Sequence, residues 1–209
     1  MGLNTLEELR AFCNDLSSDR PAPGGGTASA AAGSMSASLL VMVCGISLKS
    51  RKLEDHWPAL LEEKTNAEHL RDKLLDLCAK DSEAYSELAA VFRRTREMTD
   101  DKEVLAARDP AVRNATDIPL ETARNCLQLL RISKMVAQIG IRNASSDVEV
   151  AIELAEAGLR GAAANVRINL TSCEDGEYRS RMGTEISSLL RAAEDMRESA
   201  LRRLRPQSL

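Results

Sequence analysis

Residues 23–48 read PGGGTASAAAGSMSASLLVMVCGISL, and this stretch decides the fold. From Ala28 to Leu48 it has no charged side chain, and a stretch of that length is long enough to span a bilayer. It also holds five serines and many alanines, and no second stretch of this kind occurs in the sequence. We therefore expect a buried central helix over about residues 27–49 and no association with a membrane.

The composition of the whole chain favours helices. The 209 residues are 44% hydrophobic and 29% charged, which suits one soluble domain over residues 1–209 with a single core. Aromatic residues make up 2%, whereas alanine, leucine and methionine are plentiful, and these side chains lose little rotamer freedom in a helix. No segment alternates polar and apolar residues over a useful length, so we expect no sheet.

Capping residues, prolines and glycines divide the rest of the chain into further helices. The expected segments are 5–17, 58–94, a shorter one capped near Asp100 or Glu103 and interrupted by Pro110, 119–140, 146–171, and a last one that follows Gly176 and ends near Arg205. Long helices joined by short loops predict an all-α, antiparallel up-and-down helical bundle.

Charge and the placement of cysteine and histidine argue against several function classes. The net charge of −4 argues against a nucleic-acid binder. Five cysteines lie far apart without a Cys-x-x-Cys pair, and His56 and His69 have no metal-ligand spacing, so we expect no disulfide framework, no metal and no cofactor. The N-terminus lacks the basic and apolar pattern of a signal peptide, which favours a cytoplasmic protein.

Within the expected helix 58–94, a carboxylate interrupts the apolar stripe. Leu74, Leu77, Tyr85 and Leu88 follow the helical spacing of three and four, and Asp81 fills the position between them. Burying an unpaired carboxylate costs several kcal/mol, so this side chain must find partners or shift its pKa. Two interpretations remain open. Asp81 is either a general base, a general acid or a binder of a cationic ligand, or it caps a neighbouring helix.

A second polar stripe falls on the expected helix 146–171 and the residues before it. Asn143, Asp147, Asn165 and Asn169 lie near one face if the helix is continuous. Asparagine offers donors and an acceptor together, which suits a heterocycle with ring nitrogens and carbonyls. Asp147 has a second interpretation, since a carboxylate in the first turn of a helix stabilises the helix dipole.

The glycines at positions 24–26 lead directly into the central helix. They allow the backbone to approach another surface, and the N-terminus of the helix offers free N–H groups to an anion or a carbonyl. A plain tight turn is an equal alternative. Within the helix, small residues share one face that permits close packing of helices inside the chain or across a dimer, namely Ala30, Gly33, Ala37 and Cys44.

Five fragments occur in an order that is similar to one family of folate enzymes. They are residues 23–30 (PGGGTASA), 81–85 (DSEAY), 115–120 (ATDIPL), 143–147 (NASSD) and 158–169 (GLRGAAANVRIN). Together they resemble the formiminotetrahydrofolate cyclodeaminase and methenyltetrahydrofolate cyclohydrolase family. Two segments depart from the family pattern, residues 48–53 (LKSRKL) and 92–96 (FRRTR).

The resemblance implies an all-helical, homodimeric enzyme without metal that binds a reduced folate in a groove between helices. The length of the chain resembles standalone bacterial cyclohydrolases, which implies hydrolysis of methenyltetrahydrofolate to formyltetrahydrofolate. A cyclodeaminase, which releases ammonia from formiminotetrahydrofolate, is the alternative. A second alternative is a helical module that binds a ligand or a protein without catalysis.

The cyclohydrolase reaction assigns roles to the polar residues. Water attacks a cationic one-carbon bridge, so the reaction needs a base near that carbon and a proton donor for the departing nitrogen. We expect Asp81 to be this base or an electrostatic anchor, with Asp147 as the second choice. The expected substrate-binding residues are Pro23, Gly24, Gly25, Gly26, Tyr85, Asn143, Asn165, Asn169 and, for the glutamate tail, Lys49.

Overall fold

The computed structural model of the chain describes residues 3–97 and 106–204, and it is helical throughout these ranges apart from short connections. The α-helices are α1 (Leu3–Leu16), α2 (Gly25–Ser47), α3 (Trp57–Glu97), α5 (Arg108–Ile139), α6 (Ser145–Leu170) and α7 (Gly176–Leu204), with short 3-10 helices η1 (Arg51–His56) and η2 (Arg142–Ala144). No strand occurs in the described ranges, and the predicted all-α class is confirmed.

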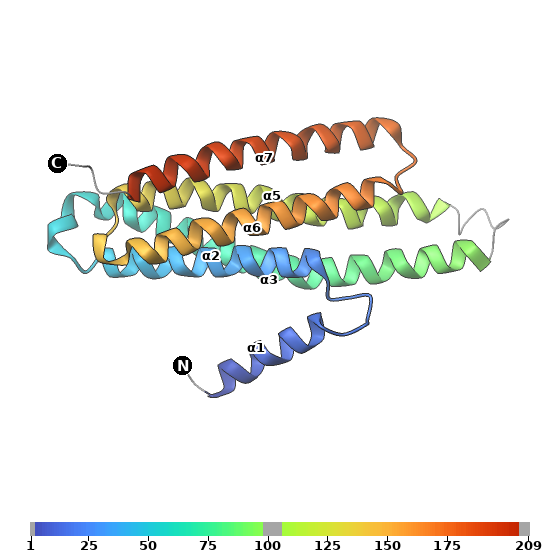
Figure 1. The fold of residues 1–209 in the computed structure, drawn as a ribbon, viewed down its shortest axis with the longest axis horizontal. Helices are drawn as coiled ribbons and strands as arrows, with labels where there is room; N and C mark the ends of the chain where they lie inside the picture. Colours follow the sequence, from blue (N-terminus) through green and yellow to red (C-terminus); the bar gives the residue numbers. More distant parts are fainter. Residues whose placement is uncertain (1–2, 98–105, 205–209) are drawn as a thin grey trace.

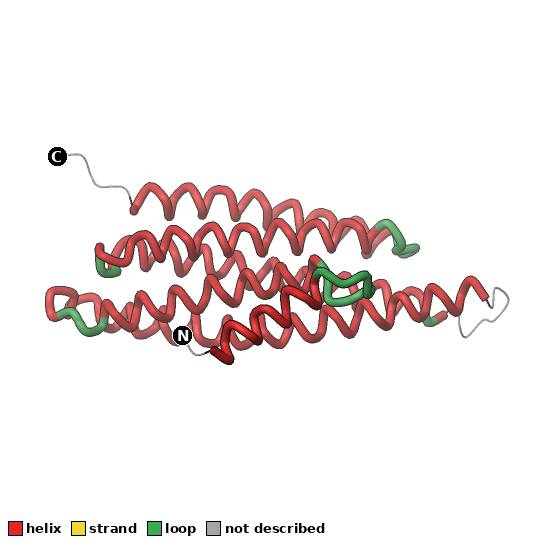
Figure 2. Tube along the Cα trace, turned by 60° about the horizontal axis from the view of Figure 1, so that its bottom comes forward, coloured by secondary structure: helices red, strands yellow, loops and turns green. Residues whose placement is uncertain are grey.

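Four of the helices form a square bundle. α2 packs against α3 and α6, α5 packs against the same two helices, and α7 covers the edge formed by α5 and α6. Consecutive helices from α2 to α7 run antiparallel, as Figure 1 shows and the turned view of Figure 2 repeats. One continuous cluster of buried apolar side chains runs through the bundle and includes Leu40, Leu74, Leu130, Ile152 and Ile186.

The charge-free segment forms α2, and half of its most apolar stretch is buried inside the bundle. α2 is the one described helix that is long and apolar enough to cross a membrane. Its small residues allow close contact with α6, because a side chain at Gly158 would place a carbon 2.8 Å from the backbone oxygen of Ser29. The small-residue face, which includes the buried residues Ala30 and Gly33, therefore packs inside the chain.

α5 differs from the prediction of a helix that begins near Pro119 and a separate, shorter, earlier one that Pro110 interrupts. Residues 108–139 form one helix with Pro110 in its first turn and Pro119 in its interior. A proline in the first turn is tolerated because the N–H that it lacks would have no intrahelical partner there. Pro119 removes an interior hydrogen bond, and a side chain of α6 replaces it, as described below. The expected cap at Asp100 or Glu103 lies outside the described residues.

α1 stands apart from the bundle. It makes at most marginal contact with the other helices, and the loop 17–24 connects its last residue to the start of α2 (Figure 1). Its Leu6 and Leu9 side chains are half-exposed. Among the described residues the apolar face of α1 therefore has little to pack against, and an isolated helix of this length is barely stable in water.

Candidate functional site

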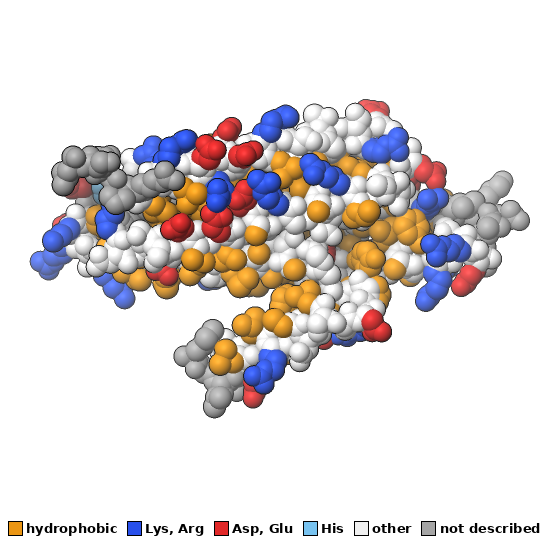
Figure 3. Space-filling model, in the orientation of Figure 1, with side chains coloured by type: hydrophobic (Ala, Val, Ile, Leu, Met, Phe, Trp, Pro, Cys, Tyr) orange, Lys and Arg blue, Asp and Glu red, His pale blue; other side chains and the backbone are white. Residues whose placement is uncertain are grey.

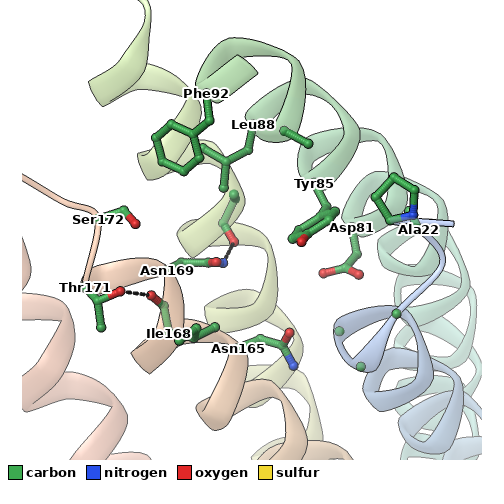
Figure 4. Close-up of a pocket in the computed structure, with 16 residues that line it drawn as sticks. Ala22, Asp81, Tyr85, Leu88, Phe92, Asn165, Ile168, Asn169, Thr171 and Ser172 are labelled. Atoms are coloured by element: carbon green, nitrogen blue, oxygen red, sulfur yellow. Dashed lines mark hydrogen bonds between the residues drawn. The ribbon is translucent and has the colours of Figure 1, made fainter. Parts of the chain in front are cut away.

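A cavity lies where α2 begins. α3, α5 and α6 continue past Gly25, the first residue of α2, so one corner of the square bundle is left without a helix. The space that remains has a volume of about 500 Å³. Seven of the predicted site residues line it, namely Gly24, Gly25, Gly26, Asp81, Tyr85, Asn165 and Asn169 (Figure 4).

Asp81 lies in the wall of this cavity and is tied to the start of α2. The Thr27 hydroxyl donates a hydrogen bond of 2.8 Å to Asp81 Oδ2. Gly24, the N-cap residue of α2, has no side chain that could cap the helix. Asp81 of α3 therefore contacts the first turn of α2 through the Thr27 side chain and also faces the cavity, so both interpretations from sequence stay compatible with its position.

The surroundings of Asp81 shift the pKa of its carboxyl group. Burial raises the pKa of the Asp81 carboxyl above its ordinary value, and hydrogen bonding with Thr27 lowers it again in part. Burial also raises the pKa of the neighbouring Cys78 thiol to about 11, so that thiol stays protonated at neutral pH. A carboxyl whose pKa moves toward neutrality is suited to accept and return a proton.

The three glycines meet different surroundings. A side chain at Gly26 would overlap the Asp81 carboxylate, so glycine is required for the carboxylate to reach the helix end. A side chain at Gly25 would touch the Asn165 amide at 3.4 Å, whereas one at Gly24 would meet nothing within 4 Å. No glycine in the described residues has a positive φ. Close approach at Gly26, rather than a special turn, explains this position.

Both asparagines of α6 use their nitrogen inside the protein. Asn165 Nδ2 donates to the Gly161 carbonyl oxygen over 2.9 Å. Asn169 Nδ2 donates to the Ala115 carbonyl oxygen over 2.6 Å (Figure 4). The Ala115 carbonyl is free because Pro119, four residues later, has no N–H. The amide oxygens of both asparagines and the Asp81 carboxylate remain as acceptors, a set that suits a ligand rich in N–H groups.

Apolar and aromatic side chains line the remainder of the cavity. Sequence reasoning missed these apolar lining residues and two polar ones beside them, namely Pro21, Ala22, Leu88, Ala89, Phe92, Ala115, Ile168, Thr171 and Ser172. Leu88 and Phe92 continue the stripe of Tyr85 and Asp81 on α3, so the helical period already placed them on this face, although they read as core. Ile168 is 63% exposed, which its apolar neighbours in sequence did not indicate.

Three predicted residues lie elsewhere in the protomer. Asn143 and Asp147 precede and begin α6, and Lys49 follows the end of α2, at the opposite end of the bundle. At a rise of about 1.5 Å per residue, Asp147 lies about 27 Å from Asn165 along α6. The expectation that these residues share one cavity with Asn165 and Asn169 is therefore not met within one chain. The side chain of Pro23 does not line the cavity.

Within residues 3–97 and 106–204, no group of three or more histidine, cysteine, aspartate or glutamate side chains is placed to hold a metal ion. The residues that line the cavity offer acid–base chemistry from one carboxyl, hydrogen-bond acceptors from two amides and an apolar surface for a flat ring.

Comparison with known proteins shows the family to which the chain belongs. The methenyltetrahydrofolate cyclohydrolase of Methylorubrum extorquens is 33% identical over 193 residues, which cover 92% of this chain and 93% of that enzyme. The formimidoyltransferase-cyclodeaminase of Sus scrofa is 30% identical over 94% of this chain, which corresponds to 36% of that longer protein. The crystal structure of formiminotetrahydrofolate cyclodeaminase from Thermotoga maritima superposes with a TM-score of 0.86 at 26% identity, covering 94% of both chains. Residues 8–188 match the formiminotransferase-cyclodeaminase family, and the chain belongs to this family.

Proposed function

We propose that this protein is a methenyltetrahydrofolate cyclohydrolase, which hydrolyses methenyltetrahydrofolate to formyltetrahydrofolate in one-carbon metabolism. The observation that carries the proposal is the Asp81 carboxylate, which is half-buried in a cavity lined by acceptors and apolar side chains. The similarity to a cyclohydrolase over nearly the full length of both chains supports the same activity.

The reaction needs one proton carrier beside the one-carbon bridge. Water attacks the cationic methenyl carbon and forms a C–O bond, while Asp81 accepts a proton from that water. The bond between this carbon and one bridging nitrogen then breaks, and Asp81 returns the proton to the departing nitrogen. The hydroxyl proton leaves to solvent as the formyl C=O forms, so one proton is released per turnover. The ionised carboxylate also attracts the cation of the bound substrate.

The acceptors orient the pterin ring. Its ring N–H and amino groups match the amide oxygens of Asn165 and Asn169, and the aromatic rings of Tyr85 and Phe92 offer flat surfaces to the substrate. Asn143, Asp147 and Lys49 stay proposed site residues on the condition that a second copy of the chain carries them to this cavity. We propose no cofactor, because proton transfer and binding account for the chemistry.

The cyclodeaminase activity is the second candidate, since the similar Thermotoga maritima enzyme carries that name. Incubating the purified protein with methenyltetrahydrofolate and with formiminotetrahydrofolate separates the two. Loss of methenyl absorbance above the spontaneous rate is the expected result. Ammonia release from the formimino substrate without hydrolysis of the methenyl substrate would replace the proposal with the cyclodeaminase. Turnover of neither would indicate a non-catalytic helical module.

We also propose a cytoplasmic homodimer that acts on a small molecule and not on nucleic acid or a membrane. Large apolar side chains are exposed on the uncovered side of α2 and α6, namely Met35, Met42, Ile46 and Val150. Figure 3 shows hydrophobic side chains on the part of the bundle that faces α1 and on α1 itself. α2 carries no charged side chain, so the same face of a second copy can cover it without removing an ion from water. The unpartnered α1 supports the same arrangement, because a second copy supplies apolar surface for it.

A further inference from the structure

The cavity changes character along its length. Gly26, Asp81 and Asn165 form a polar end at the start of α2. Leu88 and Phe92 form an apolar end about two to three helical turns beyond Asp81 along α3 (Figure 4). Ser172, in the connection between α6 and α7, also lies at the apolar end. A long ligand with one polar ring therefore has one favourable direction in the cavity.

A cation lies against the apolar end. Arg108, the first residue of α5, places its guanidinium carbon 5.3 Å from the centre of the Phe92 ring. Arg108 Nη1 forms an ion pair with Glu174 Oε1 at 2.9 Å. The Arg108 side chain is 37% exposed and the Glu174 side chain is 73% exposed. A guanidinium held over an aromatic face is a rigid, oriented set of donors.

The donors of Arg108 are incompletely used. A guanidinium has five N–H donors, and Glu174 is the one carboxylate that pairs with Arg108 in the part of the chain that the structure describes. Arg108 Nε is buried and has no acceptor among those residues. The pair with Glu174 is open to solvent, and such pairs contribute little stability, so another carboxylate can replace Glu174 at small cost.

The nearby cations are less suited to this role. Arg113 pairs with Asp175 over 2.5 Å and also lies 3.7 Å from Asp109, and its guanidinium stacks on Tyr178. Arg20 pairs with Asp15, and the arginines that lie over an aromatic ring in the described residues are Arg108, Arg113 and Arg181. Arg108 alone among these three combines contact with a cavity residue and a weakly held partner.

We propose, resting on the proposed function, that Arg108 receives a carboxylate of the glutamate tail of the folate substrate in exchange for Glu174. The order of polar end, apolar section and cation then matches the order of pterin, p-aminobenzoyl group and glutamate in a folate. The pterin lies at the start of α2 with the methenyl bridge beside Asp81, and the tail leaves past Phe92. This places the tail site at the opposite end of the bundle from Lys49.

Calorimetric titration with two ligands tests the assignment. The ligands are 5-formyltetrahydrofolate and its counterpart without glutamate, 5-formyltetrahydropteroate, and the proteins are wild type, Arg108→Gln, Arg108→Lys, Glu174→Gln and Arg131→Gln. Arg131 is the matched control, because it is an exposed arginine of the same helix that bonds Gln128 outside the cavity. Binding of the glutamate-free ligand shows that each variant is folded.

The wild type is expected to bind the glutamate-bearing ligand about tenfold more tightly than the glutamate-free one, as one charge-assisted pair predicts. Arg108→Gln should lose this preference and keep its affinity for the glutamate-free ligand, Arg108→Lys should keep part of it, and Arg131→Gln all of it. Glu174→Gln decides between roles: a carboxylate receptor predicts a preference equal to or above wild type, because the competing carboxylate is gone.

Two results would overturn the inference while leaving the proposed function intact. In one, Arg108→Gln keeps the wild-type preference. In the other, Glu174→Gln loses it as Arg108→Gln does, which would make the pair a structural clamp. A wild-type protein that binds neither ligand would overturn the proposed function, and the inference with it.

Discussion

The Asn169 side-chain nitrogen donates a 2.6 Å hydrogen bond to the Ala115 carbonyl oxygen at the cavity wall. In an unbroken helix this carbonyl would accept the N–H of residue 119, but Pro119 has none. The same contact therefore repairs the backbone of α5 and holds Asn169 with its amide oxygen left for the substrate. The Asn169 side chain therefore has one role in the stability of α5 and another in the proposed binding of substrate.

A double-mutant cycle separates these two roles. Asn169→Ala should lower the free energy of unfolding by about 1–3 kcal/mol, because a buried carbonyl loses its partner. Adding Pro119→Ala restores an N–H to the helix and should recover most of that loss without recovering the affinity for substrate. Denaturant unfolding and KM measured on the same variants check both parts. A double variant no more stable than Asn169→Ala would contradict the repair.

Asp81→Asn should lower turnover at least tenfold, because the proton acceptor is lost. The fold should persist. Burial raises the pKa of Asp81, so its contribution to stability is fully present below the unfolded pKa and is lost as the pH rises through the folded value. At pH 7 the variant is therefore expected to melt no lower than wild type. Asp147→Asn is the matched carboxylate control, and a larger loss of turnover there than in Asp81→Asn would transfer the role to Asp147.

The pH profile of kcat/KM should respond to Thr27. Because Asp81 acts in its ionised form, activity falls as the pH drops through its pKa. The Thr27 hydroxyl lowers that pKa, so Thr27→Val should raise it and move the acid limb of the profile to higher pH. Asp81→Asn should have no such limb. A profile of Thr27→Val that coincides with wild type, or shifts to lower pH, would remove Asp81 from the rate-determining protonation.

Two glycine-to-alanine substitutions should have opposite effects on stability. Gly158→Ala puts a carbon 2.8 Å from the Ser29 backbone oxygen and 2.9 Å from Cys126 Sγ, and overpacking of this kind costs about 1–3 kcal/mol. Gly183, inside α7, meets nothing within 4 Å, so Gly183→Ala should stabilise by about 0.5–1 kcal/mol through helix propensity. Thermal unfolding of both variants is the measurement, and equal shifts would refute the close contact of α2 with α6.

Charge on the uncovered face of α2 should break the dimer. The double substitution Met35→Glu and Met42→Glu would bury two carboxylates in the proposed interface, whereas Leu61→Glu adds a charge at an exposed apolar residue of α3. Light scattering after size exclusion should give a dimeric mass for wild type and Leu61→Glu and a monomeric mass for the double variant. A monomeric wild type would contradict the proposed dimer. A monomeric Leu61→Glu beside a dimeric double variant would place the interface on another face.

Local sequence was enough for the class of the fold and for one wall of the cavity. The spacing of three and four that carries Leu74, Asp81, Tyr85 and Leu88 places these residues on one face of α3, because a helix repeats every 3.6 residues whatever surrounds it. The charge-free composition of α2 indicated a helix packed among others for a similarly local reason. The family resemblance read from five short fragments was confirmed over residues 8–188.

Tertiary structure decided where along these helices the chemistry gathers. α5 continues through Pro119 because its missing bond is replaced by Asn169, 54 residues beyond Ala115, and no local pattern contains such a partner. Helical periodicity placed Asp147 and Asn165 on one stripe, but it did not indicate the position along the helix at which a cavity opens. That position depends on how far α3 and α6 extend beyond the first turn of α2, which follows from the packing of three separate helices. The sequence alone therefore determined the faces, and the packed bundle determined the site.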